Sequence, residues 1–177
     1  MLKAFAVIGA VVVAGIAVVL ILAAMRPDQF RVQRSAAIKA PPEKIFPLIS
    51  DLKAWTTWSP FEKDPAMKRT YGASTSGKGA TYAWDGNSQV GAGDVLITDA
   101  PAPSRVSLDL NMVRPFEAHN MVDFTLTPAG ERTTVTWAMR GDVPYFAKII
   151  HMFVNMDRMV GGEFEKGLAN IKAIAEK

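Results

Sequence analysis

The chain begins with a long apolar run. Residues 4–24 are drawn only from Ala, Val, Ile, Leu, Phe and Gly, with Lys3 before them and Arg26-Pro27-Asp28 after them. A helix rises ~1.5 Å per residue, so about 20 apolar residues cross the ~30 Å hydrocarbon core of a bilayer. The run predicts one N-terminal transmembrane helix, and residues 1–29 are assigned to this anchor and its linker.

A cleaved secretory signal is the alternative interpretation of the same run. The apolar region of a signal is about 7–15 residues long, which is shorter than this one. Cleavage after Ala24 would place Leu22 at the −3 position, where a small residue is needed, and cleavage after Ala17 would leave an apolar tail on the mature protein. We therefore favour an uncleaved, single-pass anchor in the cell (inner) membrane.

The side of the membrane on which the following domain lies stays open. Arg26, Arg31 and Arg34 follow the run, whereas Lys3 and the amino terminus precede it. The positive-inside rule taken alone favours a cytoplasmic domain. Short N-terminal anchors can also place the following domain outside, so the sequence leaves both orientations open.

After the linker the pattern changes to alternating apolar and polar positions. The alternation predicts about seven strands, at 30–39, 67–71, 78–84, 89–98, 104–112, 117–127 and 133–140. Asp85-Gly86-Asn87 is typical of a hairpin turn between two of them. The strands read as an antiparallel meander with one face exposed to water.

Two helices complete the predicted domain at 30–177. Pro41-Pro42-Glu43 is typical of a helix start and precedes a short amphipathic helix that ends near Leu52. At the other end of the chain, apolar residues recur at helical spacing: Met156, Val160, Phe164, Leu168 and Ile171. This stripe must be buried against the sheet, which predicts an α+β fold with a curved antiparallel sheet around one long C-terminal helix.

Composition removes several classes of function. The chain has no cysteine, which excludes disulfides, thiolate metal sites and cysteine nucleophiles, and it has only two histidines. The formal net charge is +3, without a run of Lys or Arg. We therefore expect no nucleic-acid partner, no metal and no cofactor.

The order of several short motifs resembles the SRPBCC superfamily, the START/Bet v 1-like helix-grip proteins that include the polyketide cyclase/dehydrase-like group. The resemblance covers the whole domain and depends on these segments: Ile38-Lys39-Ala40-Pro41-Pro42-Glu43-Lys44-Ile45-Phe46, Trp55-Thr56-Thr57-Trp58-Ser59-Pro60-Phe61, Gly77-Lys78-Gly79, Trp84-Asp85-Gly86-Asn87, Gly91-Ala92-Gly93 and Gly167-Leu168-Ala169-Asn170-Ile171-Lys172. Each motif alone is unspecific. Their order favours the helix-grip fold.

The resemblance implies a hydrophobic cavity between the sheet and the long helix, and it implies no fixed catalytic set. The apolar positions that would line this cavity share the inner faces of the strands and the helix: Val106, Leu108, Leu110, Phe124, Leu126, Val135, Trp137, Met152, Met156, Met159, Val160 and Phe164. The alternative for these residues is a solidly packed core without a ligand.

Other candidate positions surround this predicted cavity. Trp55, Trp58 and Phe61 form a candidate lid or membrane-contacting loop, although a plug at the open end of the sheet is the favoured interpretation. His151 is a candidate proton carrier near the cavity mouth, and His119 falls on the outer face of its strand. Arg34 shares its face with apolar residues, so it needs an acidic or ligand partner.

Three hypotheses of function follow. The first is a membrane-anchored module that binds or transports a hydrophobic small molecule or lipid. The second is an enzyme of the cyclase/dehydrase type, which is disfavoured because no nucleophile and no paired histidine is identified. The third is a protein-interaction module like the chaperone activators of this fold, which would leave the protein partner unknown.

Overall fold

The computed structural model describes residues 2–177, and the side chains of residues 8–150 and 152–177. Its elements are α1 (Leu2–Ala24), β1 (Gln29–Ile38), α2 (Pro42–Ser50), the 3-10 helix η1 (Ala54–Thr57), β2 (Lys68–Tyr71), β3 (Thr81–Asp85), β4 (Ala92–Asp99), β5 (Arg105–Arg114), β6 (Ala118–Ala129), β7 (Arg132–Asp142), α3 (Tyr145–His151) and α4 (Met156–Ala175).

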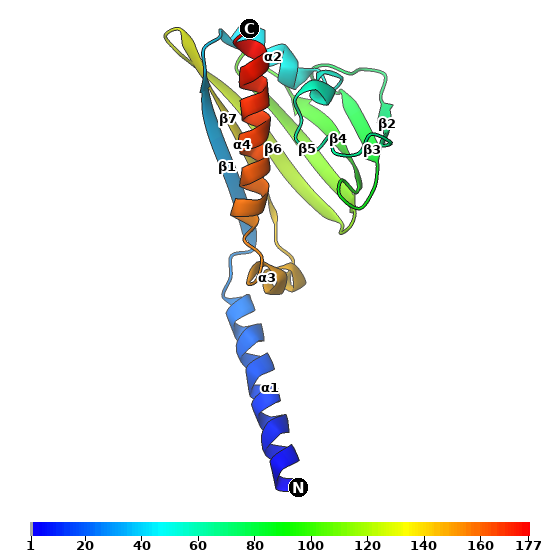
Figure 1. Ribbon diagram of the computed structural model, residues 1–177, viewed down its shortest axis with the longest axis vertical. Helices are drawn as coiled ribbons and strands as arrows, with labels where there is room; N and C mark the ends of the chain where they lie inside the picture. Colours follow the sequence, from blue (N-terminus) through cyan, green and yellow to red (C-terminus); the bar gives the residue numbers. More distant parts are fainter. Residues whose placement is uncertain (1) are drawn as a thin grey trace.

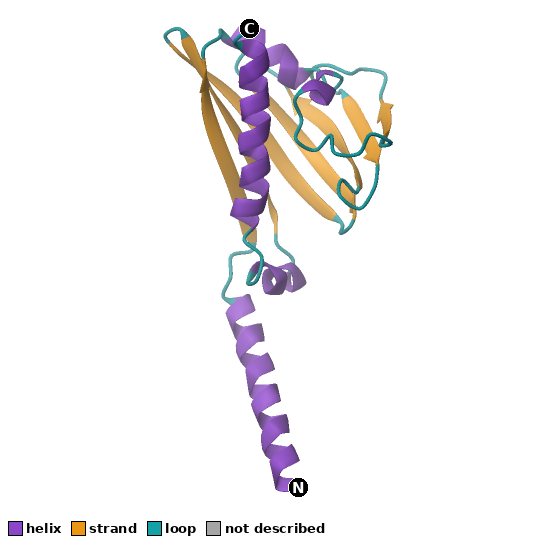
Figure 2. Ribbon diagram, viewed as in Figure 1, coloured by secondary structure: helices purple, strands orange, loops and turns teal. Residues whose placement is uncertain are grey.

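The seven strands form one antiparallel sheet in the order β1-β7-β6-β5-β4-β3-β2. The sheet curves around α4, which crosses its concave inner face, while α2 and η1 cover the end of the sheet farthest from α1 (Figures 1 and 2). The predicted α+β fold, with its antiparallel sheet and long C-terminal helix, is therefore confirmed.

The inner face and α4 enclose the apolar core. Phe164, Leu168 and Ile171 of the predicted helical stripe are buried, as are the alternating inward residues of β5, β6 and β7. The Trp137 ring stacks on the Phe164 ring with centroids 4.1 Å apart. Burial of each such side chain contributes about 1.5–3 kcal/mol, so this layer is the main source of stability.

Close approach of α4 to Trp137 depends on Gly167. A Cβ at this position would lie 2.7 Å from the Trp137 ring and 3.0 Å from Pro60. A larger residue would therefore push the helix away from the sheet.

Arg34 fixes the first half of α4 to β1. Its Nη1 and Nη2 donate to the Asp157 carboxylate at 3.0 and 2.9 Å, and its Nε donates to Glu165 at 2.7 Å. Nη1 and Nη2 also donate to the backbone oxygens of Gln33 and Asp157. The hydrogen bond to Asp157, followed by that to Glu165, raises the pKa of Arg34, and the same bond lowers the pKa of Asp157.

The predicted need of Arg34 for an acidic partner is thus confirmed, and the guanidinium leaves no room for a side chain at Gly161. A Cβ built there would overlap Arg34 Nη2, whereas a Cβ at the neighbouring Gly162 would meet nothing within 4 Å. Only the first of the paired glycines is required by packing.

α1 projects from the sheet domain beside α3 (Figure 1). Its described side chains are apolar and largely exposed, with Ala23 as the buried exception. Within the described residues, the structure contains no helix that is both long enough and apolar enough to cross a membrane. The predicted transmembrane anchor is therefore not supported by the structure.

We predict opposite effects of alanine at the two glycines. Gly162→Ala should raise the free energy of unfolding by up to about 1 kcal/mol, the helix-propensity difference. Gly161→Ala should lower it, because the new methyl group displaces the Arg34 guanidinium from Asp157. Denaturant unfolding measures both. In an Arg34→Ala background, Gly161→Ala should become as favourable as Gly162→Ala; a stabilising Gly161→Ala in the native background would contradict the explanation.

Candidate functional site

The inner face of the sheet has two halves that differ in packing. In the half far from α1, the predicted wall residues are buried: Val106, Leu108, Phe124, Leu126, Val135, Trp137 and Phe164. Trp58 fills the space among them, with its ring centroid 5.6 Å from that of Trp137 and 6.1 Å from that of Phe124. This half is packed core.

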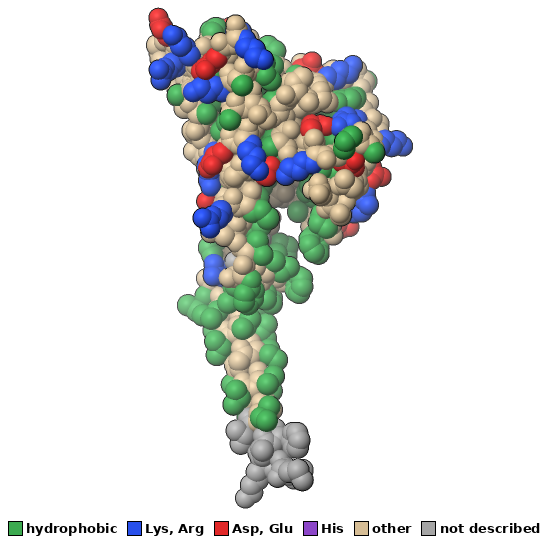
Figure 3. Space-filling model, in the orientation of Figure 1, with side chains coloured by type: hydrophobic (Ala, Val, Ile, Leu, Met, Phe, Trp, Pro, Cys, Tyr) green, Lys and Arg blue, Asp and Glu red, His purple; other side chains and the backbone are tan. Residues whose placement is uncertain are grey.

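Toward α1 the inner face is less covered. Leu110 and Met112 follow Leu108 along β5 and are half-buried, and Met156 and Val160 of α4 are half-buried too. The space-filling view shows a notch beside this half of α4, between the helix and the lobe that carries β2–β4 (Figure 3). We call this region the α1-side half of the inner face.

One row of paired residues crosses the α1-side half and carries two polar side chains. In this row Tyr82 of β3 pairs with Val95, Val95 with Leu110, and Leu110 with Asn120 of β6. Three strand spacings of about 4.8 Å separate the polar ends by ~14 Å. Leu110 is half-buried in this row, whereas Tyr82, Val95 and Asn120 are buried, so two apolar side chains lie between a polar group at each end.

Asn120 is 7% exposed, and its amide atoms are not among the fully buried polar atoms that lack a partner in the described part of the chain. It lies across Gly141, where a Cβ would overlap Asn120 Oδ1.

Tyr82 lies in an aromatic ladder with Tyr71 and Trp84, whose ring centroids are 5.1 and 6.0 Å from that of Tyr82. Arg69 beside it donates to Glu62 and to Met67 O, and its buried Nε is without a partner among the described residues. Burial raises the pKa of Tyr82 to about 12. The phenol therefore stays a neutral hydrogen-bond donor at physiological pH.

The aromatic loop after α2 lies mostly in the core. Trp58 is fully buried and donates its indole N–H to Leu48 O at 2.7 Å; Trp55 is half-buried and donates to Ile49 O at 2.9 Å. Phe61 is 44% exposed, and its ring lies nearly perpendicular to that of Trp137, with the ring centroids 6.4 Å apart. A role as lid stays a prediction, for which Phe61 has the required exposure.

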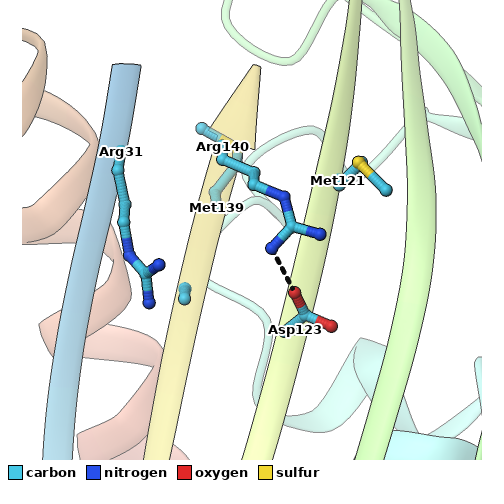
Figure 4. A pocket seen from close by; sticks show the side chains of 6 residues that line it. Arg31, Met121, Asp123, Met139 and Arg140 are labelled. Carbon is cyan, nitrogen blue, oxygen red and sulfur yellow. Dashed lines mark hydrogen bonds and ion pairs between the residues drawn. The ribbon is translucent and has the colours of Figure 1, made fainter. Parts of the chain in front are cut away.

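Two small hollows lie away from the predicted cavity. The first is a shallow depression on the outer face, lined by Arg31, Met121, Asp123, Ala138, Met139 and Arg140, where Arg140 donates to Asp123 at 3.2 Å (Figure 4). The second, of about 260 Å³, is an open hollow between the β3–β4 connection and Arg114-Pro115. Neither includes a predicted wall residue, so the enclosed cavity stays a prediction.

The remaining candidates are dispersed. His119 lies on the outer face, as its strand position predicts, and its Nδ1 is hydrogen-bonded to Asn111 Oδ1. The side chain of His151, the candidate proton carrier, lies outside the described residues. Met152 is half-buried after α3, and Met159 is exposed. Among the described residues, no cluster of three or more carboxylate or imidazole side chains could hold a metal ion.

Sequence reasoning missed Asn120 and the pairing of Arg69 with Glu62. Asn120 shares its parity with Val122 and Phe124 in one strand, so the alternation that predicts an inward Phe124 also predicts an inward amide. The pairing of Arg69 with Glu62 joins a strand to the preceding loop, and no local spacing indicates it.

The sequence matches the family described as polyketide cyclase/dehydrase and lipid transport over residues 29–176. The chain belongs to this family. No curated protein matches the sequence.

Solved structures show the same fold at low sequence identity. A protein from Chromobacterium violaceum has a TM-score of 0.59 and 13% identity, with 86% of this chain and 99% of the other covered. DynU16, from the dynemicin biosynthetic locus, has a TM-score of 0.58 and 14% identity, with 86% of this chain and 48% of DynU16 covered. The Aha1 dimer from Colwellia psychrerythraea has a TM-score of 0.56 and 16% identity, with 83% of this chain and 96% of the other covered. At these identities the similarity extends to the fold alone.

We predict that Tyr82 is the last tyrosine of the sheet to ionise. Its folded pKa of about 12 exceeds the unfolded value of about 10, so its stabilising contribution is complete below pH 10 and is lost as pH rises through 12. Tyrosinate absorbance followed against pH measures the steps. Tyr82→Phe should remove the highest one; an unchanged highest step would show that Tyr82 is not buried as described.

Proposed function

We propose that this protein binds an apolar small molecule or lipid on the α1-side half of its inner face, beside a membrane into which α1 inserts. The observation that carries the proposal is the half-buried apolar floor around Leu110, bounded by Tyr82 and Asn120. An apolar side chain flanked by a phenol and an amide favours binding of a ligand over covalent chemistry.

The chemistry of the row fits an amphipathic ligand. Chains or rings would cover Leu110, Met112 and Val160, gaining about 25 cal/mol for each Å² of apolar surface removed from water. The neutral Tyr82 phenol donates a hydrogen bond, and the Asn120 amide donates and accepts. The methionines adapt their shape, which suits a site whose ligand varies in form. The description of the family, which includes lipid transport, supports the same class of ligand.

Membrane association is proposed for residues 1–29, with 30–177 as the ligand-binding domain. The described side chains of α1 from Ile8 to Leu22 are apolar and mostly exposed, with values such as 67% for Val13 and 60% for Ile21. An exposed apolar surface of this extent is typical of an interaction site and is removed from water by lipid. The cell membrane, on either side, is the proposed location.

A second candidate is catalysis of the cyclase/dehydrase type. The observation that favours it is Tyr82 beside Arg69, because a neutral phenol next to a guanidinium could donate a hydrogen bond to a developing oxyanion. His151 stays an alternative proton carrier. The presence of DynU16 among the similar folds is compatible with this candidate. Protein binding is the third alternative.

The ligand site is tested by photocrosslinking with a diazirine-labelled phosphatidylcholine in nanodiscs containing the full chain. We expect adducts on the inner face near Leu110 and on the first turns of α4. Leu110→Trp should fill the site and reduce these adducts at least severalfold, whereas Leu96→Trp, an exposed position of β4, is the matched control. Adducts confined to α1 in every variant would contradict the proposed site.

Insertion of α1 is tested by alkaline carbonate extraction of membranes from cells that express the full chain. The unaltered protein should stay in the pellet. Ile16→Arg places a charge among apolar side chains, at a cost of about 2.5–3.5 kcal/mol in the middle of a membrane helix, and should shift protein to the supernatant. Intact mass identifies the amino terminus; a mature chain that begins near Met25 would overturn the proposal and favour a cleaved signal.

A further inference from the structure

α3 has the reverse of the polarity expected for a helix in water. Its lysine, Lys148, is buried, while Tyr145, Phe146 and Ile150 are exposed. Phe146 is 70% exposed, and Phe153 in the turn after α3 is 78% exposed. A surface helix normally buries its apolar side chains and exposes its charges.

The buried lysine has hydrogen-bond and ion-pair partners inside the protein. Lys148 Nζ donates to Arg26 O at 3.0 Å and forms an ion pair with Asp28, so it ties α3 to the linker between α1 and β1. Tyr145 Oη donates to Leu20 O of α1 at 2.7 Å. α3 is therefore held beside the last turns of α1, and its exposed apolar side chains continue the apolar surface of α1.

A second apolar element ends the sheet on the same side. The register places Gln29, Asp142 and Met112 near one end, so the β5–β6 connection lies at the end of the sheet to which α1 is joined. Phe116 in this connection is 71% exposed, and Val113 at the end of β5 is 56% exposed.

The opposite end of the domain has the opposite character. The loops at 39–41, 72–80, 100–104 and 129–132 contribute no large exposed apolar side chain among the described residues. In the space-filling view charged side chains concentrate at this far end, and hydrophobic ones concentrate around α3 and α1 (Figure 3). Polarity thus changes along the long axis of the protein.

We infer that α3 with Phe153, together with the β5–β6 connection, forms a docking surface that rests on a lipid bilayer. The inference rests on the proposed insertion of α1, whose apolar surface it extends. Aromatic side chains are favoured at the boundary between headgroups and acyl chains, where Phe146, Phe153 and Phe116 would lie. Arg26 and Arg158 are exposed near this surface, and so are Asp28, Asp142 and Asp157, so its apolar side chains rather than a net charge favour the bilayer.

Docking in this way has a consequence for the ligand. The notch beside α4 lies on the α1 side of the domain (Figure 3). With α3 at the headgroups, a lipid would pass from the bilayer to the inner face without crossing bulk water. The docking surface thus fixes the orientation of the domain as well as its distance from the membrane.

The chain contains no cysteine, so single-cysteine spin labels report each position separately. We would label Val12→Cys in α1, Phe146→Cys, Phe153→Cys and Phe116→Cys, and Glu131→Cys at the far end, each in the full chain in nanodiscs with anionic lipid. Collision rates with oxygen and with a water-soluble nickel complex give the depth of each label. We expect Val12 to be deepest, Phe146, Phe153 and Phe116 to lie at the boundary between headgroups and acyl chains, and Glu131 to lie in water.

The outcomes separate this inference from the proposed function. If Val12 is in lipid while Phe146, Phe153 and Phe116 match Glu131, α1 inserts but the docking surface does not exist. If Val12 is also in water, the proposed membrane association itself fails. Dipolar broadening between labels at Phe146 or Phe153 would overturn the inference in favour of contact with a second copy.

Discussion

The structure depends on how α4 meets the inner face of the sheet. The Trp137–Phe164 stack and the close approach at Gly167 set the distance between helix and sheet. Four hydrogen bonds from Arg34 to Asp157 and Glu165 set the position of the first half of the helix. Burial of apolar area supplies most of the free energy at the stack. The contacts of Arg34 with Asp157 and Glu165 are partly exposed, so they define geometry more than they add stability.

This arrangement divides the inner face and so creates the candidate site. Aromatic side chains fill the half that α2 and the Trp58 loop cover. Toward α1 no such loop covers the sheet, and Leu110 and Met112 stay half-buried. The α1-side half contains the Asn120 amide and the Tyr82 phenol, two polar groups at the ends of one row of paired residues. The polarity of α3 and of the β5–β6 connection then relates this half to a membrane surface.

The alternation of apolar residues predicted the sheet well. Side chains alternate between the two faces of a strand, so one buried residue determines which of the other residues in that strand point inward. Val122 and Phe124 are inward as predicted, and so are Val135 and Trp137. The stripe from Met156 to Ile171 likewise predicted α4.

The site could be predicted only in part. Whether Val106 lines a cavity or packs solidly depends on side chains from four distant segments, and Asn120 was overlooked among apolar neighbours of the same parity. The polarity of α3 could not be predicted because Lys148 is satisfied by Arg26 O and Asp28, groups more than a hundred residues earlier in the chain. The role of Gly161 required the guanidinium of Arg34 to be placed first.

The most direct test of the account is native mass spectrometry of the full chain released from native host membranes in mild detergent, followed by organic extraction. The account predicts a discrete additional mass that persists after the detergent is removed, and that the extract identifies as a lipid or another apolar small molecule. A protein that remains without ligand, and gains none from a lipid extract of its host, would contradict it.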